Sequence, residues 1–368
     1  MTTRLGPLVD DMVRTMYDGD QAGFRRASGR VWTEAQSCDP DELTAAVEQI
    51  APRLGGIYGT FAKVAVLAGA LVEFGASPLS LCEVLPNRAI TAMSLFELFP
   101  RAWKQVSGGE PLPDRADLSE MGRVREAFAE DAKRRGISAG GADAIAFSWF
   151  DVDDWVSPML TVMAQRRFRD AMSTDHRDEL RAAAEAVAGE IDGADWLHGL
   201  SLVLDDEPLI VLDPASGRGF RLTISGVGDN FQLHTLIADK VIGAPEDGLI
   251  AGLPPEPAWV AAATDGVHGP FDPPAAICRR FRLFDGRGGY VSPEGRPCDI
   301  EPLDGTRVVV LHPPLGNYGW QFGRSYEHMA PTVTLDRVLE PAEAARLLSR
   351  IAPARETDLM AINRDRIG

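Results

Sequence analysis

The sequence predicts two parts of different fold class: an all-helical N-terminal half over residues 1–200 and a smaller α+β domain over residues 201–368. The first observation is periodicity, since apolar residues recur every three or four positions through most of the first 200 residues. The second is proline, which rises from 9 residues in positions 1–200 to 17 in positions 201–368. The third is a series of short β-branched runs between glycine-rich turns after residue 200. We therefore expect the domain boundary between Gly193 and Pro208.

In the helical half, amphipathic segments precede and follow a strongly apolar stretch. Residues 57–74 are apolar on nearly all sides and predict one buried helix. Pro100 is expected to end the helix that begins near Arg88. Pro158 is expected to kink or restart the helical pattern of residues 143–171. These breaks predict short helices that stack on one another.

The α+β half is expected to contain short, mainly antiparallel strands and a few helices. Each expected strand is rich in β-branched or aromatic residues and is bounded by turn residues. The strands are Leu209–Leu212, Phe220–Ile224, Phe281–Phe284 and Thr306–Leu311. One helix should begin after a cap at Asp229 or Asn230, and a terminal helix should run from Glu340 through Ile351.

The charge balance excludes two classes of partner. The chain has 37 basic and 54 acidic residues, a formal net charge of -17, and both halves are acidic. Its field therefore repels phosphate backbones and anionic lipid, so we expect neither a nucleic-acid nor a membrane partner. The four cysteines are far apart and show neither disulfide nor zinc-site spacing. With no apolar run typical of a secretory signal, the sequence predicts a cytoplasmic protein, and its Ala, Arg, Gly and Asp bias is typical of bacterial coding.

An acidic cluster in the helical half is the first candidate functional site. Asp151, Asp153 and Asp154 follow the apolar run 144–150. Closely spaced carboxylates bind a divalent cation or retain a proton on one member, because like charges in one site repel. The cluster therefore predicts a carboxylate site for metal binding or proton transfer. The alternative is that Asp151 or Asp153 caps the following helix while the other carboxylates are solvated.

The string Asp151-Val152-Asp153-Asp154 resembles two family motifs over a short stretch. It is similar to the first motif of haloacid-dehalogenase-type phosphatases, which implies Asp151 as nucleophile and Asp153 as acid. That family has a threonine where this chain has Trp155. The string also resembles the acid motif of class II terpene cyclases, in which the middle aspartate protonates an alkene inside a helical barrel. The chain has the helices and tryptophans of that setting but not its length or repeat.

His234 is the second candidate. At about 100° per residue, it falls inside the apolar arc of the helix expected after Asp229, whereas Gln232 and Thr235 fall outside that arc. Burying an unpaired imidazole costs a few kcal/mol, so the ring needs a hydrogen bond or a function. We expect either a satisfied histidine in the core or between the domains, or a general base or ligand oriented by a carboxylate.

His312 is the third candidate, because it follows the expected strand 306–311 and directly precedes two prolines. The turn before His234 holds two of the glycines of a dinucleotide fingerprint, but Phe231 occupies the third position and no P-loop lysine follows. Serine-hydrolase and zinc-protease motifs do not occur either. The sequence therefore assigns no cofactor-binding and no metal-binding residue, and the cofactor is unknown.

Two functions are compatible with these observations. The first is a cytoplasmic accessory protein whose helical half docks a peptide or protein partner. The alternative is an enzyme with its site in the cleft between the domains. In it, His234 or His312 performs acid/base chemistry, or Asp151, Asp153 and Asp154 hold a metal. A small-molecule ligand fits either function.

Overall fold

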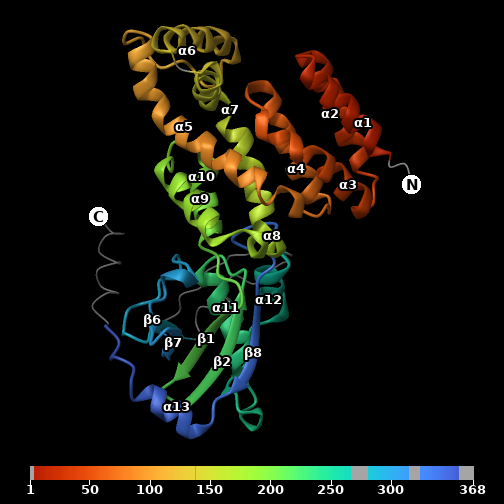
Figure 1. Cartoon of the computed structure of the whole chain (residues 1–368). Helices are drawn as coiled ribbons and strands as arrows, with labels where there is room; N and C mark the ends of the chain where they lie inside the picture. Colours follow the sequence, from red (N-terminus) through yellow and green to blue (C-terminus); the bar gives the residue numbers. More distant parts are fainter. Residues whose placement is uncertain (1–3, 137, 267–280, 315–323, 356–368) are drawn as a thin grey trace. The chain divides into compact units, whose positions relative to one another are not determined.

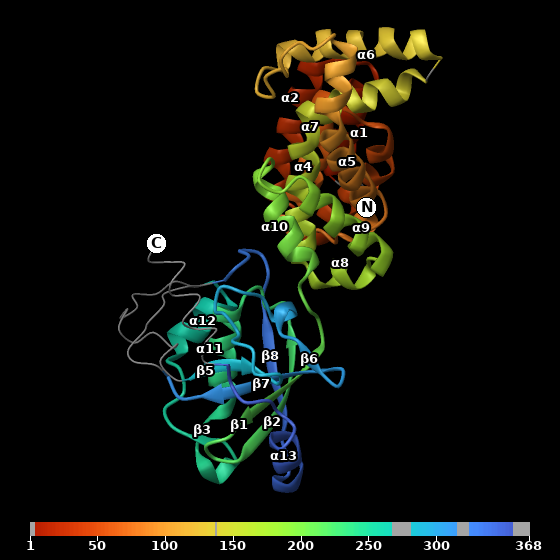
Figure 2. The same cartoon turned by 90° about the vertical axis from the view of Figure 1, so that its left-hand side faces the viewer.

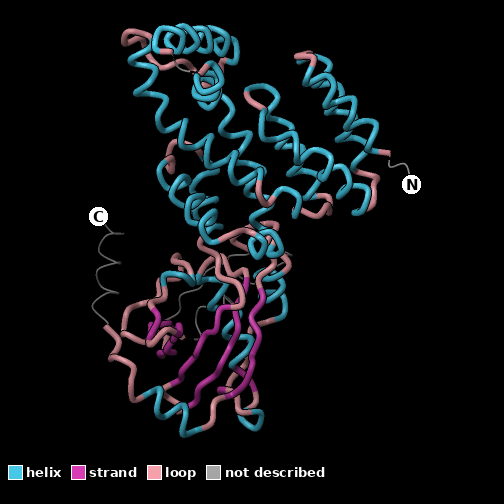
Figure 3. The backbone as a smooth tube through the Cα atoms, in the orientation of Figure 1, coloured by secondary structure: helices cyan, strands magenta, loops and turns pink. Residues whose placement is uncertain are grey.

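The computed structural model describes residues 4–136, 138–266, 281–314 and 324–355. The chain divides into two compact units, Met1–Ser201 and Leu202–Gly368, each with its own internal packing. Among the described residues, strands occur only in the second unit (Figure 3). The predicted fold class, an all-helical N-terminal half followed by a smaller domain of mainly antiparallel strands and a few helices, is confirmed.

The helical unit is built around its longest helix, α7 (Ala139–Ala164), which packs against α4, α5, α6 and α10 (Figure 1). Because α7 is apolar on several sides, its core positions are covered by these neighbours. The other helices of the unit are α1 (Leu5–Tyr17), α2 (Gln21–Ala35), α3 (Pro40–Ile50), α4 (Lys63–Glu73), α5 (Val84–Val106), α6 (Met121–Arg135), α8 (Arg166–Ala171), α9 (Thr174–Ala186) and α10 (Asp192–Ser201). Short 3-10 helices are η1 (Ala51–Gly56), η2 (Gly59–Ala62), η3 (Leu79–Leu81) and η4 (Leu118–Glu120).

The expected helix end at Pro100 is wrong, because α5 continues through this residue. Helix α7 likewise continues through Pro158, so no new helix starts there. An internal proline removes a backbone hydrogen bond, so packing must offset that cost. At Pro158 the neighbouring α4 contributes Gly69, where an added Cβ would lie only 2.9 Å from the proline Cβ. This glycine lets the two helices approach closely around the proline ring.

The expected single helix over residues 57–74 is also wrong in its first third. Gly59 has a φ of +61°, a left-handed conformation that an α-helix cannot contain. The chain therefore forms η2 first and enters α4 only at Lys63. Residues 57–59 therefore form a loop that ends at the first residue of η2, and this loop is part of the candidate site.

The α+β unit contains one main sheet in the order β5-β7-β1-β2-β8, and β6 pairs with the beginning of β7 outside this order. Strands β1 and β7 are parallel, and the other pairings in this sheet are antiparallel. The strands are β1 (Glu207–Asp213), β2 (Arg218–Ser225), β5 (Arg282–Asp285), β6 (Pro302–Leu303), β7 (Thr306–His312) and β8 (Thr332–Val338), with a separate parallel pair β3 (Ile242–Gly243) and β4 (Ile250–Ala251). The helices are α11 (Asn230–Val241), α12 (Pro257–Thr264), α13 (Pro341–Leu348), and the 3-10 helices η5 (Pro245–Asp247) and η8 (Pro297–Asp299).

Alternate residues of the central strands belong to two different core clusters, because successive side chains of a strand point to opposite faces. Leu209 and Leu311 pack in the cluster that includes α11 and α12. Leu212 and Val310 pack in the cluster that includes α13. The sheet therefore has an α11 face and an α13 face, and these elements can be followed in Figure 2. Within the described part of the chain, no helix has the length and hydropathy needed to cross a membrane.

Candidate functional site

The three candidate aspartates all lie inside α7, but their side chains have different partners. The backbone N–H of Gly59 donates to Asp151 Oδ2 at 2.6 Å. Asp153 pairs with Arg115 at 2.6 Å, and Asp154 pairs with Lys63 at 3.3 Å. Over the ranges that the structure describes, no group of three His, Cys, Asp or Glu side chains is arranged to hold a metal ion.

One expectation for these aspartates is wrong. Asp151 and Asp153 do not cap a helix, because α7 begins well before them and continues beyond them. Residues 144–150 belong to the same helix, as the pattern over residues 143–171 predicts. The spacing of about 100° per residue in a helix also explains why neighbouring carboxylates point in different directions.

Asp151 is the buried member of the set, with 2% of its surface exposed. Burial raises the pKa of Asp151 to about 7, because desolvation disfavours the carboxylate. The Gly59 N–H and the nearby Arg88 charge act in the opposite direction. Burial also raises the pKa of Asp154, with Lys63 opposing that change.

Arg88 of α5 is buried beside Asp151 and holds the same loop. Its Nη2 donates to the carbonyl oxygen of Ile57 at 2.6 Å. Its guanidinium lies 4.4 Å from the ring centroid of Tyr58 and 4.5 Å from that of Trp155. Arg88 and Asp151 therefore hold the Ile57 carbonyl and the Gly59 N–H, one at each end of the loop. We call this arrangement the buried clamp.

The rings of the buried clamp continue outward in a layered series. Tyr58 stacks on Phe147 of α7, with ring centroids 6.3 Å apart and an interplanar angle of 23°. The guanidinium of Arg125 from α6 lies 6.0 Å from the Phe147 centroid on the outer side of the series. Cations over aromatic faces are attracted by the ring quadrupole, most strongly where water is excluded. The series Trp155, Arg88, Tyr58, Phe147 and Arg125 thus connects α5, the loop, α7 and α6.

A surface groove of about 530 Å³ lies over this series. We call it the aromatic groove. It has four aromatic side chains, two methionines and two arginines, and no acidic residue contributes to its lining. The lining residues are Met16, Tyr17, Gln21, Pro52, Arg53, Gly56, Ile57, Tyr58, Gly59, Thr60, Phe61, Met121, Arg125 and Phe147. All belong to the helical unit, so this groove is complete within one unit.

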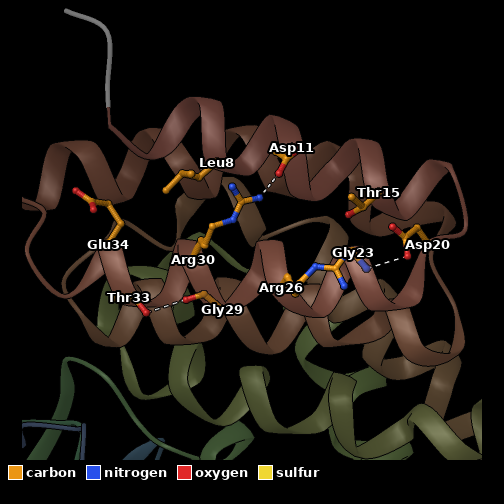
Figure 4. A pocket seen from close by; sticks show the side chains of 10 residues that line it. All are labelled: Leu8, Asp11, Thr15, Asp20, Gly23, Arg26, Gly29, Arg30, Thr33 and Glu34. Carbon is orange, nitrogen blue, oxygen red and sulfur yellow. Dashed lines mark hydrogen bonds and ion pairs between the residues drawn. The ribbon is translucent and has the colours of Figure 1, made fainter.

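A second groove of about 1000 Å³ lies between α1 and α2, and Figure 4 shows Arg30 extending from α2 toward α1. Arg30 pairs with Asp11 of α1 across the groove. Arg26 lies near Gly23 and Asp20 at its other end (Figure 4). The lining of this groove contains both acidic and basic side chains, so it does not select a ligand of one charge.

His234 lies in α11 and is almost fully buried. Its Nε2 is 2.6 Å from the carbonyl oxygen of Phe281, so Nε2 carries the proton and donates to this carbonyl. Burial lowers the pKa of His234 to about 4, which keeps the ring neutral at physiological pH. Within the described residues, Nδ1 has no hydrogen-bond partner. The geometry makes His234 a link between α11 and the residue before β5.

Gln232 and Thr235, which fall outside the apolar arc of α11, are nevertheless buried. Each is 1% exposed. The Gln232 amide accepts from the N–H of Gly228 and donates to the carbonyl of Ala263 at the end of α12. Because α12 covers the polar side of α11, the helix is buried on nearly all sides.

His312 ends β7 and lies 4.8 Å, between ring centroids, from Phe284 on the α13 face. It lines a cavity of about 340 Å³ together with Asp213, which ends the parallel neighbour β1. Asp213 accepts hydrogen bonds from the backbone of Ala215 and Ser216 in the β1–β2 turn. The structure therefore does not bring His312 and His234 together, because the α11 helix that carries His234 packs on the other face.

No family model, curated protein or solved structure matches this chain. Sequence reasoning missed Arg88, Tyr58 and Phe147, which lie on separate elements and meet only in the folded unit. One signal was present: Arg88 stands on an otherwise apolar helix face, where an arginine needs a buried partner.

Proposed function

We propose that the helical unit is a recognition module that binds a segment of a protein partner in the aromatic groove. The observation that carries this proposal is the buried clamp. Arg88 and Asp151 are both buried, and together they hold the backbone of residues 57–59, which forms part of the groove wall. Burying polar and charged side chains is costly even when they are hydrogen-bonded, and it adds little net stability relative to well-packed apolar side chains. The placement of these two side chains on this wall supports a role in positioning the binding surface.

The composition and exposure of the groove favour a peptide segment over an enclosed small molecule. Tyr17 is 67% exposed, and Arg53 and Arg125 are also exposed at the rim. Small-molecule sites bury most of the ligand surface, whereas this groove is open along its rim. Aromatic residues, methionine and arginine are enriched at protein interfaces, and the groove contains all three types.

The cytoplasm of a bacterium is the setting that we propose for this interaction. Cys38, Cys82 and Cys298 are free thiols, as expected of a reducing compartment. The acidic composition and the residue bias of the sequence support the same setting.

The test compares two neighbouring glycines of η1. Gly56 lines the groove, and Gly55 does not. Both are exposed, and an added Cβ would have no atom within 4 Å at either position. A random peptide display library is panned on the full chain, on Gly56→Glu and on the matched control Gly55→Glu. Peptides retained by the wild type and the control but lost on Gly56→Glu would support the proposal. Equal retention by all three proteins, or no retention by the wild type, would overturn it.

A second candidate function is an acid/base site in the α+β unit. The observation that favours it is the position of His312 and Asp213 at the carboxyl ends of adjacent parallel strands, beside a cavity with apolar walls. Ligands of α/β sheets often bind outside the carboxyl ends of parallel strands. A thermal-shift screen of small organic acids tests it with His312→Asn and the exposed control His328→Asn. Stabilisation lost only in His312→Asn would support this site, and no stabilisation of the wild type would refute it.

A further inference from the structure

We infer that the segment bound in the aromatic groove is acidic and inserts an apolar side chain beside its carboxylates. This inference rests on the proposed function, because it names the chemistry of the partner at the same groove. It depends on three observations: the charge of the lining, the ion pairs that its two arginines do and do not make, and the apolar side chains of the same lining.

The charge of the lining is opposite to that of the chain. The sequence has 54 acidic and 37 basic residues, and residues 1–200 alone have 31 acidic against 21 basic. The aromatic groove nevertheless contains two arginines and no acidic residue. A positive groove in a negative surface attracts an anionic segment and repels a basic one, which gives both association rate and specificity.

Arg53 presents the less committed of the two guanidinium groups. Its Nη1 lies 3.5 Å from the hydroxyl of Tyr17, and within the described residues it makes no ion pair. A guanidinium matches a carboxylate by two parallel hydrogen bonds, which a lysine ammonium does not reproduce. Arg53 is therefore the expected anchor for a glutamate or aspartate of the partner.

Arg125 is partly committed, and its geometry still favours an anion. Its Nε donates to Asp143 at 2.9 Å. Its guanidinium is held near the Phe147 ring by the layered series described above. Among the described residues, the Nη groups have no further ion pair, so they remain available to a second carboxylate of the bound segment.

The same groove lining contains apolar side chains that pack against the backbone of Gly59. An added Cβ at Gly59 would be 3.1 Å from Phe147 Cδ1 and 3.3 Å from Met121 Sδ. The missing side chain lets Phe147 and Met121 pack directly against the loop backbone. Phe61 completes this lining. An apolar side chain of the partner that packs here is stabilised by the removal of its surface from water.

The experiment uses two peptide display libraries that differ only in the sign of their charged positions. One contains Asp and Glu, the other contains Lys and Arg, and both contain Phe, Leu, Trp, Gly and Ser at the remaining positions. The full chain should retain the acidic library, and retention should fall as salt rises, because salt screens exposed charges. Arg53→Glu should lower that retention by about tenfold or more, as reversing a charge at an interface replaces attraction by repulsion. Arg26→Glu is the matched control, since Arg26 is an exposed arginine of the other groove.

The outcomes separate this inference from the proposed function. Retention of the basic library that is lost on Gly56→Glu would overturn the acidic partner and leave the recognition function standing. Retention of the acidic library that persists in the double variant Arg53→Glu, Arg125→Glu would also overturn the inference. If neither library depends on Gly56→Glu, the proposed function itself fails. A circular-dichroism melt confirms that each variant is folded before it is panned.

Discussion

Replacing Asp151 by asparagine tests the electrostatics of the buried clamp. Asparagine keeps an oxygen that can accept the hydrogen bond from Gly59, but it removes the titrating carboxyl. The folded-state pKa of Asp151 is about 7, raised from the ordinary value of 3.8 by burial. A raised carboxyl pKa means that the folded state binds the proton more tightly than the unfolded state does. The stability that comes from this tighter proton binding is fully present below pH 3.8 and is lost as the pH rises through 7.

The expected change in the free energy of unfolding follows from the pH range that an experiment can cover between the unfolded and folded pKa values of Asp151. From pH 5 to pH 7 the folded carboxyl is protonated and the unfolded one is ionised, an interval of about two pH units at 1.36 kcal/mol per unit. The free energy of unfolding of the wild type should therefore fall by about 2–3 kcal/mol relative to that of Asp151→Asn between pH 5 and pH 8. The wild type should be favoured at the lower pH, because its neutral carboxyl is at no disadvantage there.

Urea unfolding of the full chain measures this difference, with tryptophan fluorescence as the signal. Trp155 is buried against Arg88 and reports on the clamp region. The control is Asp153→Asn, which removes a carboxylate whose side chain is 62% exposed from the same helix. A difference between wild type and Asp151→Asn that stays constant from pH 5 to pH 8 would refute the raised pKa. A wild type that gains relative stability with pH would show that Arg88 outweighs burial.

Three further predictions concern other parts of the structure. Arg88→Met should lower the free energy of unfolding by about 1–3 kcal/mol, because it leaves the Ile57 carbonyl without its buried donor; an unchanged free energy in urea unfolding would contradict the clamp. The imidazole of His234 should stay neutral, with its proton on Nε2, down to about pH 4 in nitrogen NMR spectra. Since this folded pKa lies below the ordinary 6.5, the corresponding stability is present above pH 6.5 and is lost toward pH 4; a ring that titrates near 6.5 would show that it is solvated. Gly288→Ala should cost roughly 1–3 kcal/mol more than Gly217→Ala in thermal unfolding, because both have positive φ but only at Gly288 would a Cβ lie 2.2 Å from a backbone oxygen; equal costs would contradict this packing.

The fold class could be predicted from local patterns. The strands expected at Leu209–Leu212, Phe220–Ile224, Phe281–Phe284 and Thr306–Leu311 all lie within or overlap β1, β2, β5 and β7. Strand β8 was missed because Thr332, Thr334 and Asp336 alternate with its apolar residues and are exposed. A strand of this kind depends on its hydrogen bonds to β2 more than on its own hydrophobicity.

Two departures from the local patterns have a common physical origin in tertiary packing. Pro158 lies inside a helix because a glycine on the neighbouring helix makes room for its ring. Gln232 is buried because the end of α12 accepts its amide proton. Neither partner is visible from the periodicity of a single segment, since each lies far away in the sequence.

The candidate site was the least predictable part. The cluster at Asp151 to Asp154 drew attention to the correct turn of α7, but for the wrong reason. Its members separate around the helix, and only Asp151 meets the clamp. The residues that form the buried clamp with Asp151, namely Arg88 and the loop at Gly59, come from other elements. Their convergence is a property of the folded unit.

The parallel pairing of β1 with β7 affects the order in which the two units fold during synthesis. Glu207–Asp213 pairs directly with Thr306–His312, so the centre of the sheet joins segments separated by most of the α+β unit. Closing so long a loop costs entropy before any contact compensates it, which slows folding. During synthesis the helical unit can complete its own core from residues already released by the ribosome. At that stage β1 and β2 are present, but β7, the parallel partner of β1, has not yet been synthesised. A nascent chain arrested before residue 306 should therefore present a folded helical unit and an unprotected hairpin, the state in which a chaperone would meet it.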